Sequence, residues 1–262
     1  MNAPRSLFTT PSRLLAHTRY VLQDYLLLRA SLPIVFISFF AWMMIRQLVR
    51  VDRVRLQADP RFIAGMHETY GSFSAVVLYF TVFLAVIAVM TVDRTTGYYR
   101  FFFSKPVNVV SYYIHTFSVH GATVCVVLAL FALGWRSGLG WGSFMPHESL
   151  HRAVYTGVIA FALIGGLGFG FGALSNADAA LTPLSFIFAI SAQLTLADYT
   201  GPPRWLVTTA KILPPAADFE KTRKLLDQAR PFLGTPLWHV LAYGAGGWIL
   251  GLLFLRRRPL AR

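Results

Sequence analysis

The clearest set of residues that could do chemistry is His147, Glu148 and His151, which form the pattern H-E-x-x-H. On a helix this spacing places two imidazoles on one face, where they can bind zinc while the glutamate acts as general base in peptide hydrolysis. The neighbouring residues argue against that chemistry. Pro146 would place the first histidine in the opening turn of a helix, Arg152 follows the motif directly, and no third ligand lies close by. We interpret the motif as the polar start of a helix at a membrane surface, with a membrane zinc metallopeptidase as the alternative.

A second unusual segment, residues 93–113, lies between two uncharged runs, 71–92 and 112–135. Each run is long enough to cross the roughly 30 Å hydrocarbon core of a bilayer. The segment between them carries charges and must lie in water or in the interface, and Gly97 and Pro106 interrupt any single helix through it. Between these two breakers the sequence is strongly aromatic. Such aromatics either rest at the level of the lipid headgroups or dock onto another protein.

The spacing of Asp93, Gly97, Pro106-Val107 and Tyr112 resembles the loop after the second span in permease subunits of ABC transporters of the type 2 exporter class. The resemblance extends, through a six-span plan, to nearly the whole chain. It implies that this loop is cytoplasmic and carries a coupling helix that sits in a groove of a separate ATPase subunit. The residues predicted for this ATPase-coupling loop are Asp93, Arg94, Gly97, Tyr98, Arg100, Phe101, Phe102, Lys105 and Pro106.

The composition is that of an integral membrane protein. Of the 262 residues, 55% are hydrophobic and 13% are charged, and the mean hydropathy is +0.54. The formal charge of +13 resides in the connections between apolar runs, where it suits anionic lipid headgroups better than nucleic acid. Cys125 is the only cysteine, so an intrachain disulfide is excluded.

The sequence predicts a single all-α transmembrane permease domain, residues 1–262, with an amphipathic surface helix at about 11–28. The predicted spans are residues 25–45, 71–92, 112–135, 153–174, 179–197 and 234–255. An even number of spans places both termini on one side. Lys and Arg counts do not decide which side that is, and the family resemblance places both termini in the cytoplasm, in a multi-pass protein of the cell (inner) membrane.

Two spans carry further signals. The glycines of 153–174 include Gly166/Gly170, a spacing that lets helices approach closely, and none of them fits a phosphate-binding loop. The span 179–197 places Thr182, Ser185 and Gln193 near one face, where they serve either interhelical hydrogen bonds or the wall of a transport path. In the family, short non-spanning helices follow this span and cap the path on the outer face.

We therefore predict the permease subunit of an ABC exporter, which moves a substrate that the sequence does not identify. Because the chain has no ATPase motif, we expect it not to be an enzyme and to hold no cofactor, with ATP and magnesium in a partner ATPase subunit. A second permease subunit, identical or different, and membrane lipids complete the expected partners, and no nucleic acid is among them. A non-catalytic membrane scaffold is a third interpretation.

Overall fold

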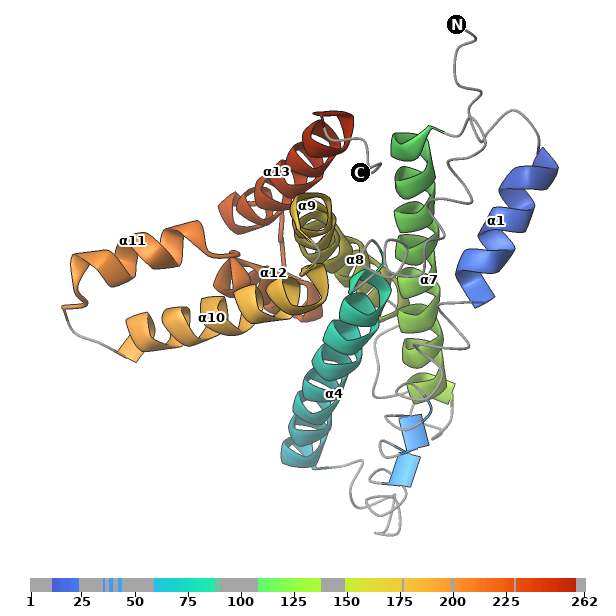
Figure 1. Ribbon diagram of the computed structural model, residues 1–262. Helices are drawn as coiled ribbons and strands as arrows, with labels where there is room; N and C mark the ends of the chain where they lie inside the picture. The colour runs from blue at the N-terminus through green and yellow to red at the C-terminus, as the bar shows by residue number, and fades with distance from the viewer. Residues whose placement is uncertain are drawn as a thin grey trace, which may run out of the picture.

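The computed structural model describes residues 11–23, 35, 38, 39, 42, 43, 59–87, 89, 108–137, 149–175, 177–198, 201–228 and 230–257. Every regular element within these ranges is a helix (Figure 1). Four stretches are long and apolar enough to cross a membrane: Val110–Gly134, His151–Leu174, Asp178–Leu196 and Thr235–Arg256. The prediction of an all-helical membrane protein is confirmed to that extent. The predicted first span, 25–45, lies outside the described residues except for five isolated positions.

The second predicted span falls on α4, Pro60–Val86, whose apolar part is the shorter stretch Gly71–Val86. The helix begins well before this stretch, whereas the sequence analysis predicted a span that begins at residue 71. A local capping signal explains the difference. Asp59 accepts a hydrogen bond from the backbone N–H of Arg61 at 2.9 Å, and Pro60 occupies the first helical position, where proline is favoured.

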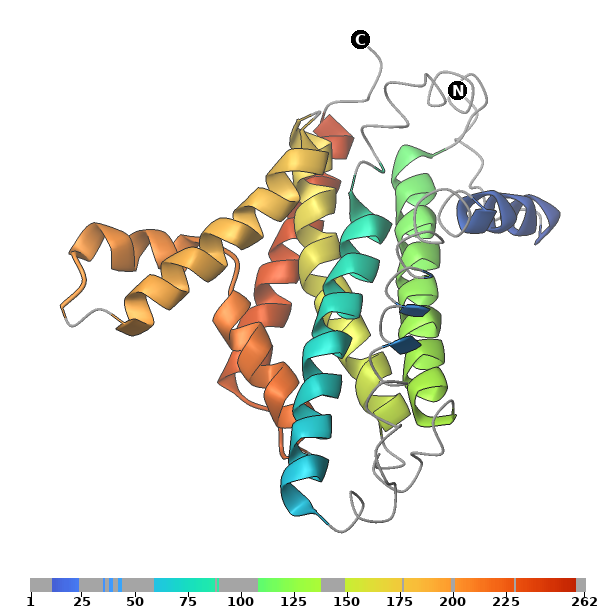
Figure 2. The same ribbon diagram turned by 90° about the horizontal axis from the view of Figure 1, so that it is seen from below.

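The centre of the bundle is one continuous helical run made of α8 (Ser149–Ala160), the π-helical turn η3 (Phe161–Gly165) and α9 (Gly166–Leu174). Its most apolar stretch is 72% buried, against 33% or less in the other three candidate spans. Around it stand α4, α7 (Val109–Ser137), α10 (Asp178–Asp198) and α13 (Thr235–Arg257) (Figure 2). The central run therefore faces protein, and the surrounding helices keep apolar outer faces for lipid.

Glycines allow α9 and α13 to pack backbone against backbone. A Cβ added at Gly166 would overlap the carbonyl oxygen of Gly244, and one added at Gly244 would overlap that of Ala162. At Gly170 an added Cβ would lie 3.1 Å from the carbonyl oxygen of Gly247. The close-packing role predicted for Gly166/Gly170 is confirmed, with α13 as the partner helix.

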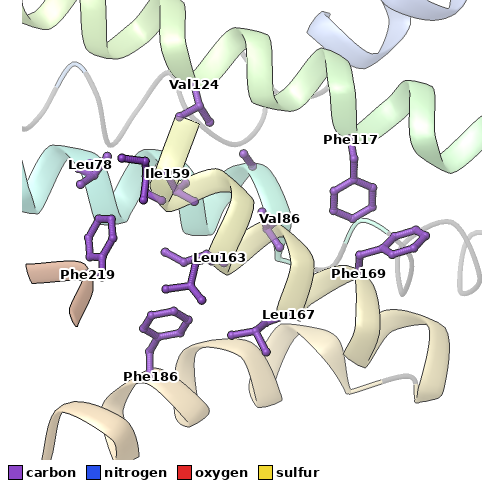
Figure 3. Packing of buried hydrophobic residues seen from close by; sticks show 14 of the residues in the cluster. Leu78, Val86, Phe117, Val124, Ile159, Leu163, Leu167, Phe169, Phe186 and Phe219 are labelled. Carbon is purple, nitrogen blue, oxygen red and sulfur yellow. The ribbon is translucent and has the colours of Figure 1, made fainter. Parts of the chain in front are cut away.

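Large side chains fill the space on either side of this crossing. Figure 3 shows Leu163 and Leu167 of the central run lying between side chains of neighbouring helices. Phe169 packs edge to face on Phe117 of α7, with ring centroids 5.2 Å apart, and stacks on Trp248 of α13 at 4.9 Å. One continuous apolar core thus joins α4, α7, α9, α10 and α13.

The chain between α10 and α13 forms two short helices, α11 (Arg204–Ile212) and α12 (Ala216–Asp227). Both views show α10 and α11 leaning away from the bundle, while α12 returns to it (Figures 1 and 2). Phe219 of α12 is 1% exposed and belongs to the common core. α12 is therefore part of the folded bundle.

The N-terminal helix α1, Pro11–Gln23, packs against α7 (Figure 2). His17 is buried there, its ring centroid 4.9 Å from that of Tyr112 and 5.0 Å from that of His115. Thr18 Oγ1 lies 3.1 Å from His115 Nε2. Burial, together with the neighbouring His115, lowers the pKa of His17 from 6.5 to about 4.

We expect Gly244→Ala to destabilise the protein by about 1–3 kcal/mol, because the added methyl group collides with the backbone of η3 at the crossing. Gly246→Ala is the matched control, since an added Cβ there meets nothing within 4 Å. It should be neutral or stabilising by up to about 1 kcal/mol through helix propensity. Thermal unfolding in mild detergent measures both, and equal effects would refute the backbone contact.

We also expect acid to release α1 from α7. Since the docked pKa of His17 is depressed, its contribution to docking is complete above pH 6.5 and is lost as the pH falls towards about 4. Spin labels at the exposed positions Leu15 and Ile114, in a Cys125→Ser background, report the distance between the helices. The distribution should broaden on acidification in the parent and stay narrow in His17→Phe. A parent distribution that does not change down to pH 4 contradicts the docking role of neutral His17.

Candidate functional site

The site with the densest polar contacts among the described residues surrounds α12, and it begins where α10 holds the start of this helix. Pro215 stands at the N-cap and provides no side-chain cap. The amide of Gln193 replaces it: its oxygen accepts from the N–H of Ala217 at 2.5 Å, and its nitrogen donates to the carbonyl of Pro214 at 3.2 Å. A side chain from a candidate span thereby satisfies the N–H of Ala217 and adds a second hydrogen bond to the Pro214 carbonyl, which also accepts from the N–H of Ala216 at 2.8 Å.

A charged triad fixes the middle of α12. Arg223 donates through Nε to Glu220 at 3.0 Å and through a terminal nitrogen to Asp227 at 2.9 Å, and its side chain is only 12% exposed. The spacings of three and four residues place all three groups on one side of the helix. Burial raises the pKa of the Asp227 carboxyl, and the Arg223 guanidinium acts in the opposite direction. The arginine is thus held between two carboxylates.

The triad continues onto α4. Tyr79 donates its hydroxyl hydrogen to Glu220 at 2.8 Å, and its ring packs edge to face on Phe219 with centroids 5.9 Å apart. Arg223 also lies 3.4 Å from the carbonyl oxygen of Gly71. Two points on α4, two turns apart, are therefore bound to two successive turns of α12. Because hydrogen bonds to charged groups are stronger than neutral ones, this is a firm connection between the two helices.

Further contacts tie α12 and its neighbour α11 to the remaining helices. His239 Nδ1 of α13 lies 2.7 Å from a carboxylate oxygen of Asp218, and Tyr243 of α13 donates to the carbonyl of Ile212 at 2.6 Å. At the other end of α12, Arg152 of α8 donates to the carbonyl of Asp227 at 2.9 Å. α12 is thus connected by polar contacts to α4, α8, α10 and α13.

These contacts indicate that α12 packs among α8, α10 and α13, whereas α11 has no buried residue and leans away from the bundle. Tyr79 lies about 12 Å along the helix axis from Gly71, where the apolar part of α4 begins, and Tyr243 lies about 12 Å from Thr235 at the start of α13, at ~1.5 Å per residue. The contacts of Tyr79 on α4 and of Tyr243 on α13 therefore lie at a similar distance from the start of each apolar helix. Non-helical backbone and ionisable groups at such a depth are tolerated where they are paired or line a watery path, and they mark candidate functional sites.

The three residues predicted for the path on α10 lie on its packed side. Thr182 is fully buried, with its hydroxyl close to Gly168 of α9, and Ser185 donates to the carbonyl of Thr182 at 2.8 Å. Gln193 caps α12, as described above. Thr182 and Gln193 therefore contact neighbouring parts of the bundle, whereas Ser185 is half-buried and bonds to its own helix, and Gln193 is the one of the three that belongs to the polar site.

The predicted ATPase-coupling residues, from Asp93 to Pro106, lie outside the described residues, as do His147 and Glu148 of the zinc motif. His151 is exposed in the first turn of α8. Within the described part of the chain, no three histidine, cysteine or acidic side chains are grouped to hold a metal ion.

Sequence reasoning missed Tyr79, Arg223 and the Asp218–His239 pair. The sequence offered one signal, a mixed-charge segment that follows two Pro-Pro pairs and precedes an apolar run. Opposite charges in it are three and four residues apart. That signal predicts the helix and its internal ion pairs. It does not predict a partner 141 residues away along the chain.

Tyr79→Phe should lower the stability of the protein by about 1.5–3 kcal/mol, because it removes a hydrogen bond to a charged carboxylate inside the bundle. Tyr155→Phe is the control, since Tyr155 is 52% exposed and its hydroxyl makes no hydrogen bond within the described residues. Thermal unfolding in detergent compares the two variants. A loss that is no larger for Tyr79→Phe than for Tyr155→Phe would show that the bond to Glu220 contributes nothing.

The arrangement places charged groups beside the apolar part of α4 and joins this helix to α12 through a hydrogen bond to a carboxylate. Comparisons with protein-family models, with curated proteins and with solved structures found no match.

Proposed function

We propose that this chain is the transmembrane permease subunit of an ATP-binding cassette exporter. Two such subunits form the transport path, and separate ATPase subunits bind on the cytoplasmic side and supply the energy. The support comes from the six-span sequence plan and from the loop motif from Asp93 to Pro106. It also comes from the four apolar helices, which correspond to four of the six predicted spans. The proposed surface position of α1 and both cytoplasmic termini belong to the same plan.

The observation that carries the proposal furthest is the bond between Tyr79 and Glu220. α4 precedes the proposed coupling loop directly in the sequence, so a force on that loop acts on this helix first. Since Tyr79 is bound to Glu220, an axial shift or rotation of α4 must either carry α12 along or break the bond. A discrete contact of this kind can switch between two states.

In the proposed cycle, closure of the ATPase subunits moves the loop, and α4 transmits the movement to α12. Tyr98 to Phe103 fill the groove of the ATPase, Asp93 and Arg94 fix the loop at the end of the span, Gly97 provides the turn, and Lys105-Pro106 end the coupling helix. α12 then acts as the outer gate of the path. Its links to Gln193 and His239 define the closed position.

We expect the tagged protein, purified in mild detergent, to bring down a soluble ATPase with Walker motifs, and Phe101→Asp to abolish this recovery because the carboxylate cannot enter an apolar groove. Phe62→Asp is the matched control, because the proposed topology places position 62 on the opposite side of the membrane. Membrane insertion should be equal in all three proteins.

Mass spectrometry of the purified material gives the readout. Equal recovery of the ATPase with Phe101→Asp refutes the coupling loop. Purification of the protein without an ATPase, with one zinc ion per chain that is lost in His147→Ala and His151→Ala, overturns the permease and favours the peptidase.

A further inference from the structure

α12 has two faces of opposite character. Ala216, Phe219, Thr222 and Leu226 are buried against the bundle. The other face is an exposed stripe, defined here as Ala217, Lys221, Lys224 and Gln228, at helical spacings of four, three and four residues. The stripe therefore presents two ammonium groups one turn apart on the side of α12 that no other described helix covers.

The two lysines are not neutralised by the acids of their own helix. Glu220 and Asp227 are both bound to Arg223, and Asp218 is paired with His239 of α13. In the described part of the chain neither Lys221 nor Lys224 forms an ion pair. The three carboxylates of α12 are thus paired with Arg223 and His239. They leave the two lysine charges of the exposed stripe without a paired carboxylate from this helix.

The position of the exposed stripe on α12 affects how strongly the two lysines attract an anion. Lys221 and Lys224 alternate along the chain with Glu220 and Arg223, which bind Tyr79 and the Gly71 carbonyl within the apolar part of α4. The two lysines thus lie on a helix that is bound to this apolar stretch, Gly71–Val86, and an anion near such a stretch gains more from two cations than it would in bulk water. The flexible stems also allow both ammonium groups to converge on one compact anion, and lysine suits phosphate as a point charge.

We propose that Lys221 and Lys224 bind a phosphate group of the transported molecule. This assignment rests on the proposed permease function and adds the substrate class to it, a phosphate-bearing amphiphile or a soluble phosphorylated compound. Gln193, which caps the helix below the stripe, and the Glu220–Arg223 pair keep the two lysines at a fixed position in the path.

The test measures binding to the purified full-length protein in a neutral detergent. The probes are phosphatidylglycerol, phosphatidylcholine and inorganic phosphate, and the readout is intrinsic tryptophan fluorescence. The variant is Lys221→Gln/Lys224→Gln. Its matched control is Arg204→Gln/Lys211→Gln, which removes two exposed charges from α11. We expect the first variant, and not the control, to raise the apparent Kd for the phosphate probe by at least about tenfold and to weaken its salt dependence.

The probes distinguish the two phosphate sources. Binding of phosphatidylglycerol that inorganic phosphate does not displace supports a lipid substrate, and displacement by inorganic phosphate supports a soluble phosphorylated one. Equal affinities of the parent and the lysine variant, equal losses in both variants, or equal binding of phosphatidylcholine and phosphatidylglycerol overturn the site. Because the assay contains no ATPase, such a result leaves the permease proposal intact, while failure to recover an ATPase is seen separately by co-purification.

Discussion

The backbone contact between α9 and α13 is the constraint on which the other contacts depend. Close approach requires glycine at both sides of the crossing, and Gly166 and Gly244 meet this requirement. The crossing fixes α13 against the central run. His239 and Tyr243, which lie on α13, thereby become fixed points from which α11 and α12 are held. A contact that contains no polar side chain thus determines where the polar site can form.

The polar site follows from the cost of burying charge. An arginine at 12% exposure beside an apolar helix must be paired, and Arg223 meets this need with two carboxylates from its own helix. The pairing leaves a lone pair of Glu220 for Tyr79 and leaves the lysines of the opposite face uncompensated. One helix of 12 residues therefore has an internally neutralised side that faces the bundle and a positive side that faces outward.

Helices that depend on a local run of residues were predicted from the sequence, whereas contacts between residues far apart in the chain were missed. Apolar length predicted the four candidate spans to within two residues at every end, because crossing a bilayer needs a continuous run. The early start of α4 was missed although Asp59 and Pro60 form a recognisable cap. The sequence analysis singled out Gln193, but its partners at Pro214 and Ala217 could not be predicted, because the folding back of α12 is set by tertiary packing.

The contact between α4 and α12 is suited to passing movement from one helix to the other. A helix transmits axial movement efficiently because its backbone hydrogen bonds are satisfied internally, so α4 needs only one firm side contact to pass movement to a neighbour. Tyr79 supplies that contact to Glu220, and Phe219 packs beneath the same ring. A shift of α4 that breaks the hydrogen bond leaves the Glu220 carboxylate bound to Arg223 alone, on the side of α12 that faces the bundle.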